Sequence, residues 1–151
     1  MRIYMDVCVL NRPLDLQEQS RIRLETEAIL SILEDCERGA VTLVISDVLL
    51  AEIFATKNAP RRDSILEFTR VAGELLSVSE SSRKTAGEFH KETGLAAMDC
   101  LHLALAQSGR VDVFLTTDDR LLRKARTLKT DFTTLNPVDF LREGYESSDR
   151  P

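Results

Sequence analysis

Residues 40–55, AVTLVISDVLLAEIFA, join a short apolar run to a segment with helical spacing. The run AVTLVIS, residues 40–46, is rich in β-branched residues and predicts a buried strand. Ser46 can cap the helix that follows, because its hydroxyl can accept a hydrogen bond from a free backbone amide of the first turn. DVLLAEIFA, residues 47–55, is predicted to form that helix. A buried strand that passes directly into a helix is typical of an α/β fold.

The same alternation of strands and helices continues on both sides of this unit. Strands are predicted at residues 2–5, 75–79 and 111–117 and within 131–137, and helices at 21–38, 60–73, 81–94, 94–109, 118–128 and 138–142. The polar, proline-containing segment 11–21 is predicted to be a loop. The pattern implies a three-layer α/β/α sandwich around a central, mainly parallel sheet with right-handed crossovers. Residues 1–151 are expected to form one domain, with a core of about residues 2–142 and a frayed tail at 143–151.

Composition narrows the class of protein. The chain has 151 residues, of which 43% are hydrophobic, and this is typical of a globular domain. No apolar run reaches the roughly 18 residues of a membrane span, and the N-terminus does not resemble a signal peptide. The three cysteines are an odd number without CxxC spacing, which argues against disulfides or a zinc site and predicts a cytoplasmic protein. The net charge of −5 does not favour nucleic-acid binding unless the basic residues cluster.

Four acidic residues are predicted to meet at one edge of the sheet. Asp6 follows the first strand, and Asp118 follows the strand at residues 111–117, so both lie at the carboxyl ends of strands. Asp99 lies in the first turn of an otherwise apolar helix, and Glu52 lies about two turns into the helix that follows Ser46. Ligands of open α/β sheets bind outside the carboxyl ends of the strands, so a common cleft is expected there.

Converging carboxylates repel one another and raise each other's pKa. A divalent cation removes this conflict, and oxygen ligands suit Mg²⁺ or Mn²⁺. Mg²⁺ keeps several waters and takes only one or two protein carboxylates. One such water can attack a phosphodiester while the ion offsets the charge of the transition state.

Each acid also has an alternative interpretation. Asp118 can act only as a helix cap, Asp99 only as a first-turn acid, and Asp6 only as part of an Asx turn. A cap cannot satisfy Glu52 in mid-helix, but a salt bridge can. His102, one turn after Asp99, is more simply explained as a packed or hydrogen-bonded histidine than as a ligand.

Four segments together resemble one known family. They are IYMDVCVLN (residues 3–11), SDVLLAEIF (46–54), AAMDCLHLALA (96–106) and FLTTDDRLL (114–122). In this order and spacing they resemble the PIN-domain family, and most closely the VapC-type toxin ribonucleases of type II toxin–antitoxin systems. The resemblance runs from Ile3 to about Leu141.

The resemblance implies a metal-dependent endoribonuclease with the four acids as catalytic residues. Asp6 and Asp99 match the family's direct ligands of Mg²⁺ or Mn²⁺. Asp118 would complete the metal site directly or through a water, and Glu52 would orient a water or a second ion. Thr116 matches the hydroxyl residue before the last acid and would hold a water at the site.

Other positions bear on substrate binding. Cys8 departs from the Ser or Asn that the family often has there, and a thiol is a poorer hydrogen-bond donor. Asn11 and Arg12 are candidates for contacts with RNA phosphate, with ordinary loop capping before Pro13 as the alternative. Further candidates for phosphate contacts, which can equally be solvated surface residues, are Arg61, Arg62, Arg120, Arg123 and Lys124.

The resemblance also implies partners: an RNA substrate, a cognate antitoxin that inserts a segment into the acidic cleft, and a second copy of the chain in a homodimer. The main alternative is a non-catalytic PIN-like module that binds RNA or protein. A phosphatase with a nucleophilic aspartate is disfavoured, because haloacid-dehalogenase-like enzymes need a second Asp where this chain has Cys8. Response-regulator receivers need adjacent early acids and a late Lys, and neither is evident.

Overall fold

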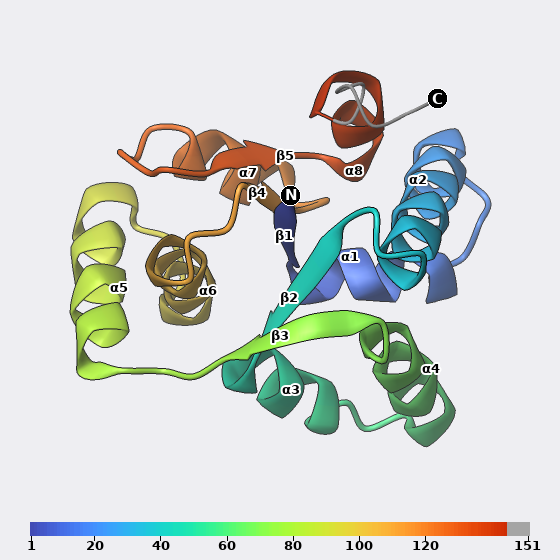
Figure 1. Cartoon of the computed structure of the whole chain (residues 1–151), viewed down its shortest axis with the longest axis horizontal. Helices are drawn as coiled ribbons and strands as arrows, with labels where there is room; N and C mark the ends of the chain where they lie inside the picture. The colour runs from blue at the N-terminus through green and yellow to red at the C-terminus, as the bar shows by residue number, and fades with distance from the viewer. Residues whose placement is uncertain (145–151) are drawn as a thin grey trace.

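A five-stranded sheet forms the centre of the computed structural model, which describes residues 1–144 (Figure 1). All neighbouring strands are parallel, in the order β3-β2-β1-β4-β5. The strands are β1 (Arg2–Met5), β2 (Thr42–Ser46), β3 (Ala72–Leu76), β4 (Val113–Leu115) and β5 (Thr133–Leu135).

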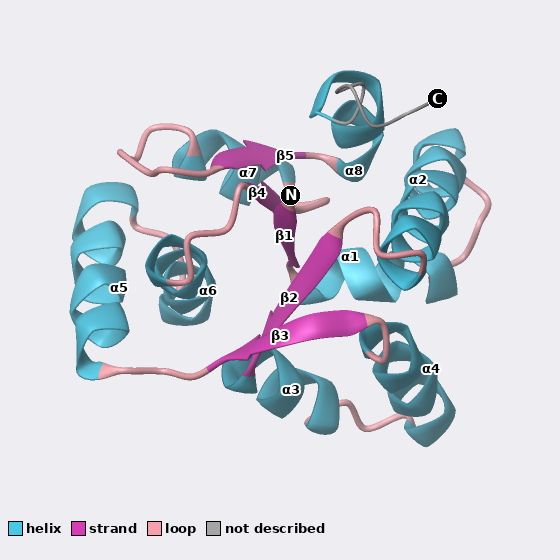
Figure 2. Cartoon of the chain, viewed as in Figure 1, coloured by secondary structure: helices cyan, strands magenta, loops and turns pink. Residues whose placement is uncertain are grey.

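Helices cover both faces of this sheet (Figure 2). They are α1 (Val7–Asn11), α2 (Ser20–Glu37), α3 (Asp47–Phe54), α4 (Ala59–Thr69), α5 (Glu80–Thr93), α6 (Ala97–Ser108), α7 (Asp119–Ala125) and α8 (Pro137–Asp139). Helices α1, α2 and α4 lie on one side, and α5 and α6 lie on the other (Figure 1). The predicted three-layer α/β/α sandwich is therefore confirmed. None of the helices in residues 1–144 has the length and apolarity needed to cross a membrane.

Two separate hydrophobic cores hold the layers together, because successive side chains of a strand point to opposite faces. Ile3 and Met5 belong to the core that includes α1, α2 and α4. Tyr4, between them, belongs to the core of α5, α6 and α7, together with Val44 and Phe114 from the neighbouring strands. The three central strands are thus buried on both faces, which explains their almost continuous apolar sequences.

The strand order reverses between β1 and β4. The chain moves from β1 to β2 and β3 on one side, and then returns to place β4 and β5 on the other. In open α/β sheets, ligands bind at such a reversal of strand order, outside the carboxyl ends of the strands. The amide of Asp6, just past β1, donates to the carbonyl of Leu115 at the end of β4 (3.0 Å). The two strand ends that carry Asp6 and Thr116 are therefore joined directly.

No element is predicted at residues 7–10, and the predicted loop at 11–21 is wrong in part, because a 3₁₀ turn forms within it and α2 begins at Ser20. Helix α1 begins immediately after Asp6 and ends at Asn11, and a 3₁₀ turn follows at Arg12–Leu14. Asp6 starts α1, because its side chain accepts from the amide of Val7. Pro13 fits the first turn of the 3₁₀ segment, where a missing N–H does no harm.

The predicted strand at 75–79 is also wrong in position. Strand β3 lies at Ala72–Leu76, and α4 ends at Thr69 instead of residue 73. β3 is an edge strand with mostly exposed side chains, so it lacks the apolar signal of a buried strand. Its pairing with β2 shifts register between Leu43 and Val44, where a Cβ on Gly73 would lie 3.0 Å from the Thr42 side chain.

Near the C-terminus the differences are smaller. Strand β4 spans Val113–Leu115, and the flanking residues of the predicted strand 111–117 lie outside it. The last helix begins at Pro137 and widens into a π-helical turn at Phe140–Gly144. Glu143 and Gly144, predicted to belong to the tail, are part of this turn. The rest of the predicted tail, residues 145–151, lies outside the described residues.

Candidate active site

Asp6 directly follows β1, where the strand order reverses, and it is only 5% exposed. Its Oδ1 accepts a hydrogen bond from the amide of Val7 (2.7 Å). Its Oδ2 accepts from the thiol of Cys8 (3.3 Å) and from the hydroxyl of Thr116 (3.3 Å). Donors from the start of α1 and from the end of β4 therefore fix both oxygens of this carboxylate.

Asp118 follows Thr116 and begins α7. Its amide donates to the Thr116 hydroxyl (3.1 Å). Its Oδ1 accepts from the amides of Arg120 (3.0 Å) and Leu121 (3.1 Å) and so caps the helix. The capping interpretation of Asp118 is therefore realised. Its Oδ2 makes no hydrogen bond or ion pair within residues 1–144, which leaves one oxygen available.

Asp99 lies in the first turn of α6 and is partly buried. Within the described part of the chain, no hydrogen bond or ion pair reaches its carboxylate. Burial raises the pKa of Asp99, and the negative charges of Asp6, Asp118 and Glu52 raise it further, whereas His102 lowers it. The charges of all three other predicted acids therefore act on Asp99, although these acids come from three distant parts of the sequence.

Asp6 has a similar environment. Burial is the main cause of its raised pKa, and the charge of Glu52 adds to the effect. His102 and the hydrogen bonds from Cys8 and Val7 oppose it. Burial and the neighbouring Asp6 raise the pKa of the Cys8 thiol to about 12, so Cys8 remains a neutral hydrogen-bond donor at physiological pH.

Glu52 lies on α3, and its carboxylate forms a hydrogen bond with Nε2 of His102 on α6. The His102 side chain is 1% exposed, and its Nδ1 forms a hydrogen bond with the hydroxyl of Tyr4 (2.6 Å). The prediction that His102 is packed and hydrogen-bonded is therefore confirmed. The sequence analysis missed Tyr4, although a tyrosine inside a buried strand is a signal, because its hydroxyl needs a polar partner.

The donor set suits a hard divalent cation. It consists of carboxylates, and within residues 1–144 no lysine or arginine forms an ion pair with Asp6 or Asp99, whose pKa values are raised. No group of three His, Cys, Asp or Glu side chains in this part of the chain could hold one ion. Mg²⁺ needs only one or two carboxylates and fills its other positions with water. A site of this kind fits the arrangement of Asp6 and Asp99.

Comparison with known proteins identifies the family. The family model of the PIN domain matches residues 3–127, which is most of the chain. The chain belongs to the PIN domain family. A comparison of this PIN domain with curated proteins found no match.

Several solved structures share the fold of this PIN domain. VapBC2 from Rickettsia felis, bound to a DNA fragment from its promoter, is 16% identical with a TM-score of 0.63, over 90% of this chain and 98% of the other. FitAcB from Neisseria gonorrhoeae is 19% identical with a TM-score of 0.60, over 89% and 97%. VapBC-1 from nontypeable Haemophilus influenzae is 17% identical with a TM-score of 0.59, over 91% and 98%. At these identities the likeness shows the fold alone.

Asn11 and Arg12, the candidate substrate contacts, take part in interactions within the PIN domain. The Oδ1 atom of Asn11 accepts a hydrogen bond from Nε of Arg61 (2.7 Å). The guanidinium of Arg61 also forms an ion pair with Asp15 through another nitrogen (2.6 Å). Arg12 forms ion pairs with Asp15 (3.1 Å) and with the buried Glu25 (3.0 Å). Three of the candidates, Asn11, Arg12 and Arg61, therefore stabilise the segment after α1, and their contact with RNA stays a prediction.

The Glu25→Gln variant is expected to lower the free energy of unfolding by about 2 kcal/mol, because charge-assisted interactions of this kind contribute about 1.5–3 kcal/mol. Glu25 is 1% exposed, pairs with Arg12 and Arg21, and accepts from Asn136 Nδ2 (2.5 Å). Urea unfolding measures the change. Glu27→Gln, at an exposed position of the same helix, is the matched control and should change stability by less than about 0.5 kcal/mol. Equal effects of the two substitutions would contradict the prediction.

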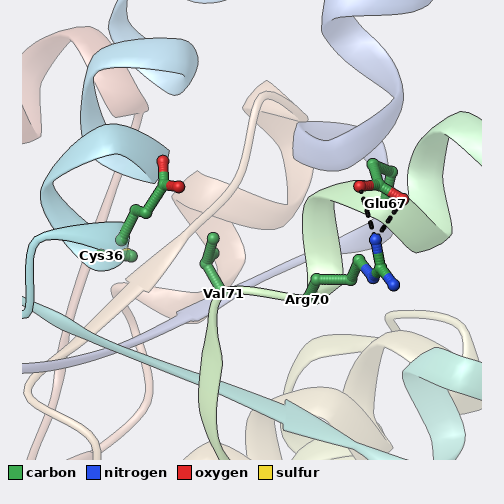
Figure 3. A pocket seen from close by; sticks show the side chains of 5 residues that line it. Cys36, Glu67, Arg70 and Val71 are labelled. Atoms are coloured by element: carbon green, nitrogen blue, oxygen red, sulfur yellow. Dashed lines mark hydrogen bonds and ion pairs between the residues drawn. The ribbon is translucent and has the colours of Figure 1, made fainter.

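A hollow outside this site lies between α2 and the end of α4 (Figure 3). It is lined by Cys36, Glu37, Glu67, Arg70 and Val71. Glu67 and Arg70 form an exposed ion pair at its edge (3.0 Å). None of its lining residues belongs to the acidic site, so we assign it no part in the chemistry.

Proposed function

We propose that this PIN domain is a metal-dependent endoribonuclease that hydrolyses RNA phosphodiester bonds, and that it is the toxin component of a toxin–antitoxin pair. The observation that carries the proposal is the electrostatic convergence of Asp6, Glu52 and Asp118 on Asp99 at the reversal of strand order. Carboxylates that lie close together repel one another, and a divalent cation relieves this repulsion.

In this proposal the four acids have different roles. A bound Mg²⁺ or Mn²⁺, held by Asp6 and Asp99 with Asp118 close by, would neutralise phosphate charge and activate a water. Thr116 and Cys8 keep the Asp6 carboxylate in place through their hydrogen bonds. The Glu52 carboxylate has one oxygen on His102 and a second that can accept a proton from the attacking water. This mechanism needs no serine, cysteine or histidine nucleophile.

The partners follow from the same proposal. An antitoxin that inserts a segment into the acidic cleft would keep RNA out, and its basic side chains would pair with the carboxylates. Met98 and Phe54 support a partner surface beside the acids, because they are 45% and 61% exposed and lie one and two residues from Asp99 and Glu52. We also propose a homodimer and a cytoplasmic location. The resemblance to VapC-type toxins supports all of these assignments.

The deciding experiment is cleavage of a mixed, end-labelled RNA pool by the purified chain, with Mg²⁺, with Mn²⁺ and with EDTA. Asp99→Asn is tested beside the wild type, because this substitution removes a charge without changing the shape of the side chain. Cleavage that needs the ion and is lost in the variant supports the proposal, and sequencing of the ends identifies the target. A folded wild-type protein that binds RNA without cutting it would favour the non-catalytic binding module. The net charge of −5 does not conflict with RNA binding if basic residues cluster where the RNA is bound.

Exposed basic residues of α7 are the candidates for holding the RNA. Arg120, Arg123 and Lys124 are exposed and form no ion pair within residues 1–144. Arg120 lies only two residues after Asp118, so it is nearest to the acids in sequence.

Arg120→Ala is expected to raise the KM for RNA about three- to tenfold and to leave kcat unchanged. It should also reduce the slope of log affinity against log salt by about 0.7, the value for one contact with single-stranded phosphate. The measurement is cleavage kinetics and RNA binding over a range of salt concentrations. Arg70→Ala on α4 removes the same charge far from the acids in sequence and serves as the control. An equal change in both variants would mean that only the overall charge matters.

A further inference from the structure

A row of buried polar side chains connects the sheet to Glu52. The hydroxyls of Ser46 and Tyr4 form a hydrogen bond (2.6 Å), and Tyr4 bonds in turn to Nδ1 of His102 (2.6 Å). Nε2 of His102 then contacts the Glu52 carboxylate. Ser46, Tyr4 and His102 are no more than 1% exposed, and they come from β2, β1 and α6. The proposed reaction uses none of these three residues directly.

We propose that Tyr4 and His102 are positioning residues that hold the Glu52 carboxylate at the acidic cleft. The inference rests on the proposed function, because it assumes that Glu52 acts on the attacking water. Each buried polar group of the row has a hydrogen-bond partner within it, which offsets the cost of removing that group from water.

The chemistry of the contacts fixes the direction of the last hydrogen bond. A carboxylate is only an acceptor, so Nε2 of His102 carries a proton and donates it to Glu52. The Tyr4 hydroxyl lies 2.6 Å from Nδ1 of His102 and 2.6 Å from the Ser46 hydroxyl, so it can donate to the ring while Ser46 donates to it. Tyr4 also stacks on Phe114, with ring centroids 5.5 Å apart, which fixes the phenol. Both nitrogens of the imidazole are thus engaged, and neither is left to bind a metal ion.

The row matters because Glu52 has a long, flexible side chain and lies in the last turn of α3. Its side chain is 26% exposed, so packing alone does not fix it. Ser46 also caps α3 by accepting from the amide of Leu49 (3.0 Å), and therefore the start of the helix and the carboxylate are tied to the same row. Catalytic side chains are commonly held in a productive orientation by hydrogen bonds from neighbouring residues that do not touch the substrate.

Variants of His102 and Tyr4 test the proposal by steady-state cleavage kinetics. His102→Asn is expected to lower kcat about tenfold with little change in KM, which is within the range for loss of such a supporting contact. His102→Gln, whose amide nitrogen can lie near the position of Nε2, should recover part of the loss. Tyr4→Phe keeps the ring and its stacking but removes the hydroxyl, and should lower kcat by less. His90→Asn, at the other histidine of the chain, should leave kcat unchanged.

The Glu52→Gln background separates positioning from general stability. A residue that acts through Glu52 loses its effect once the carboxylate is gone, so His102→Asn should cause no further loss of kcat there. An equal loss in both backgrounds would overturn the proposal. Thermal unfolding identifies variants that fail to fold, and Tyr4→Phe then replaces His102→Asn in the comparison.

Nuclear magnetic resonance of the ¹⁵N-labelled full chain gives a readout that needs no activity. The Nε2 proton of His102 should appear as a downfield ring signal that Glu52→Gln shifts and His90→Asn leaves in place. A missing signal, or one insensitive to Glu52→Gln, would overturn the proposal. If the wild type cleaves no RNA with either ion, the proposed function fails, and the positioning row is then judged on this signal alone.

Discussion

Replacing Asp6 with asparagine is expected to reduce RNA cleavage by about 1,000-fold or more, while the metal-free protein remains at least as stable as the wild type. A metal ion supplies several kcal/mol of transition-state stabilisation, which corresponds to losses of this size. The fold should tolerate the change, because asparagine is as good a helix cap as aspartate. Its side-chain oxygen can still accept from Val7, and its amide can donate to the oxygen of Thr116.

The kinetic measurement is single-turnover cleavage with saturating RNA, beside urea unfolding in EDTA. Asp119→Asn is the matched control, since it removes one carboxylate that is next to Asp118 in sequence but is exposed and paired with Arg21 (2.7 Å). It should retain cleavage within about threefold. A folded Asp6→Asn protein that cuts at the wild-type rate would remove Asp6 from the mechanism, and so would an equal loss in Asp119→Asn.

The parts of the fold that the sequence predicts are those with buried, regular patterns. Strands β1, β2 and β4 are buried on both faces and read as apolar runs, and α2 and α6 are long enough to show a helical period. The edge strand β3 lacks this signal, because one of its two sides has no neighbouring strand and its side chains are mostly exposed. Helix α1 has only five residues, fewer than two turns, so no periodicity can reveal it.

The site follows the same rule. The position of an acid at the end of a parallel strand follows from the topology of the sheet, so the sequence alone places Asp6 and Asp118 at the carboxyl edge of the sheet. Contacts between side chains from distant segments could not be placed. The sequence does not indicate that His102 contacts Tyr4 and Glu52. Nor does it indicate that Arg12 pairs with Glu25 rather than with a ligand. These contacts depend on the register and the packing of the helices on the sheet.

Burial of the Asp6 and Asp99 carboxyl groups, reinforced by repulsion from the neighbouring acids, is expected to make the stability of the metal-free protein fall as the pH rises. The pKa values of Asp6 and Asp99 are raised in the folded state, mainly by burial. Between the ordinary carboxyl pKa of about 4 and these raised values, the folded protein binds more protons than the unfolded chain. Stability is then highest at the acidic end of this window and declines as the pH rises through the raised pKa values. The measurement is the urea midpoint in EDTA at a series of pH values.

The double variant Asp6→Asn/Asp99→Asn isolates this contribution, because all other titrating groups remain. Its stability relative to the wild type should increase with pH and then level off. Mg²⁺ should reverse the loss in the wild type at neutral pH, since an ion that binds only the folded state stabilises it by mass action. This effect should weaken as the pH falls, because protons compete for the same carboxylates. A parallel pH dependence of the two proteins, with the same response to Mg²⁺, would mean that the pKa values of these two acids are not raised by folding and that they do not hold the ion.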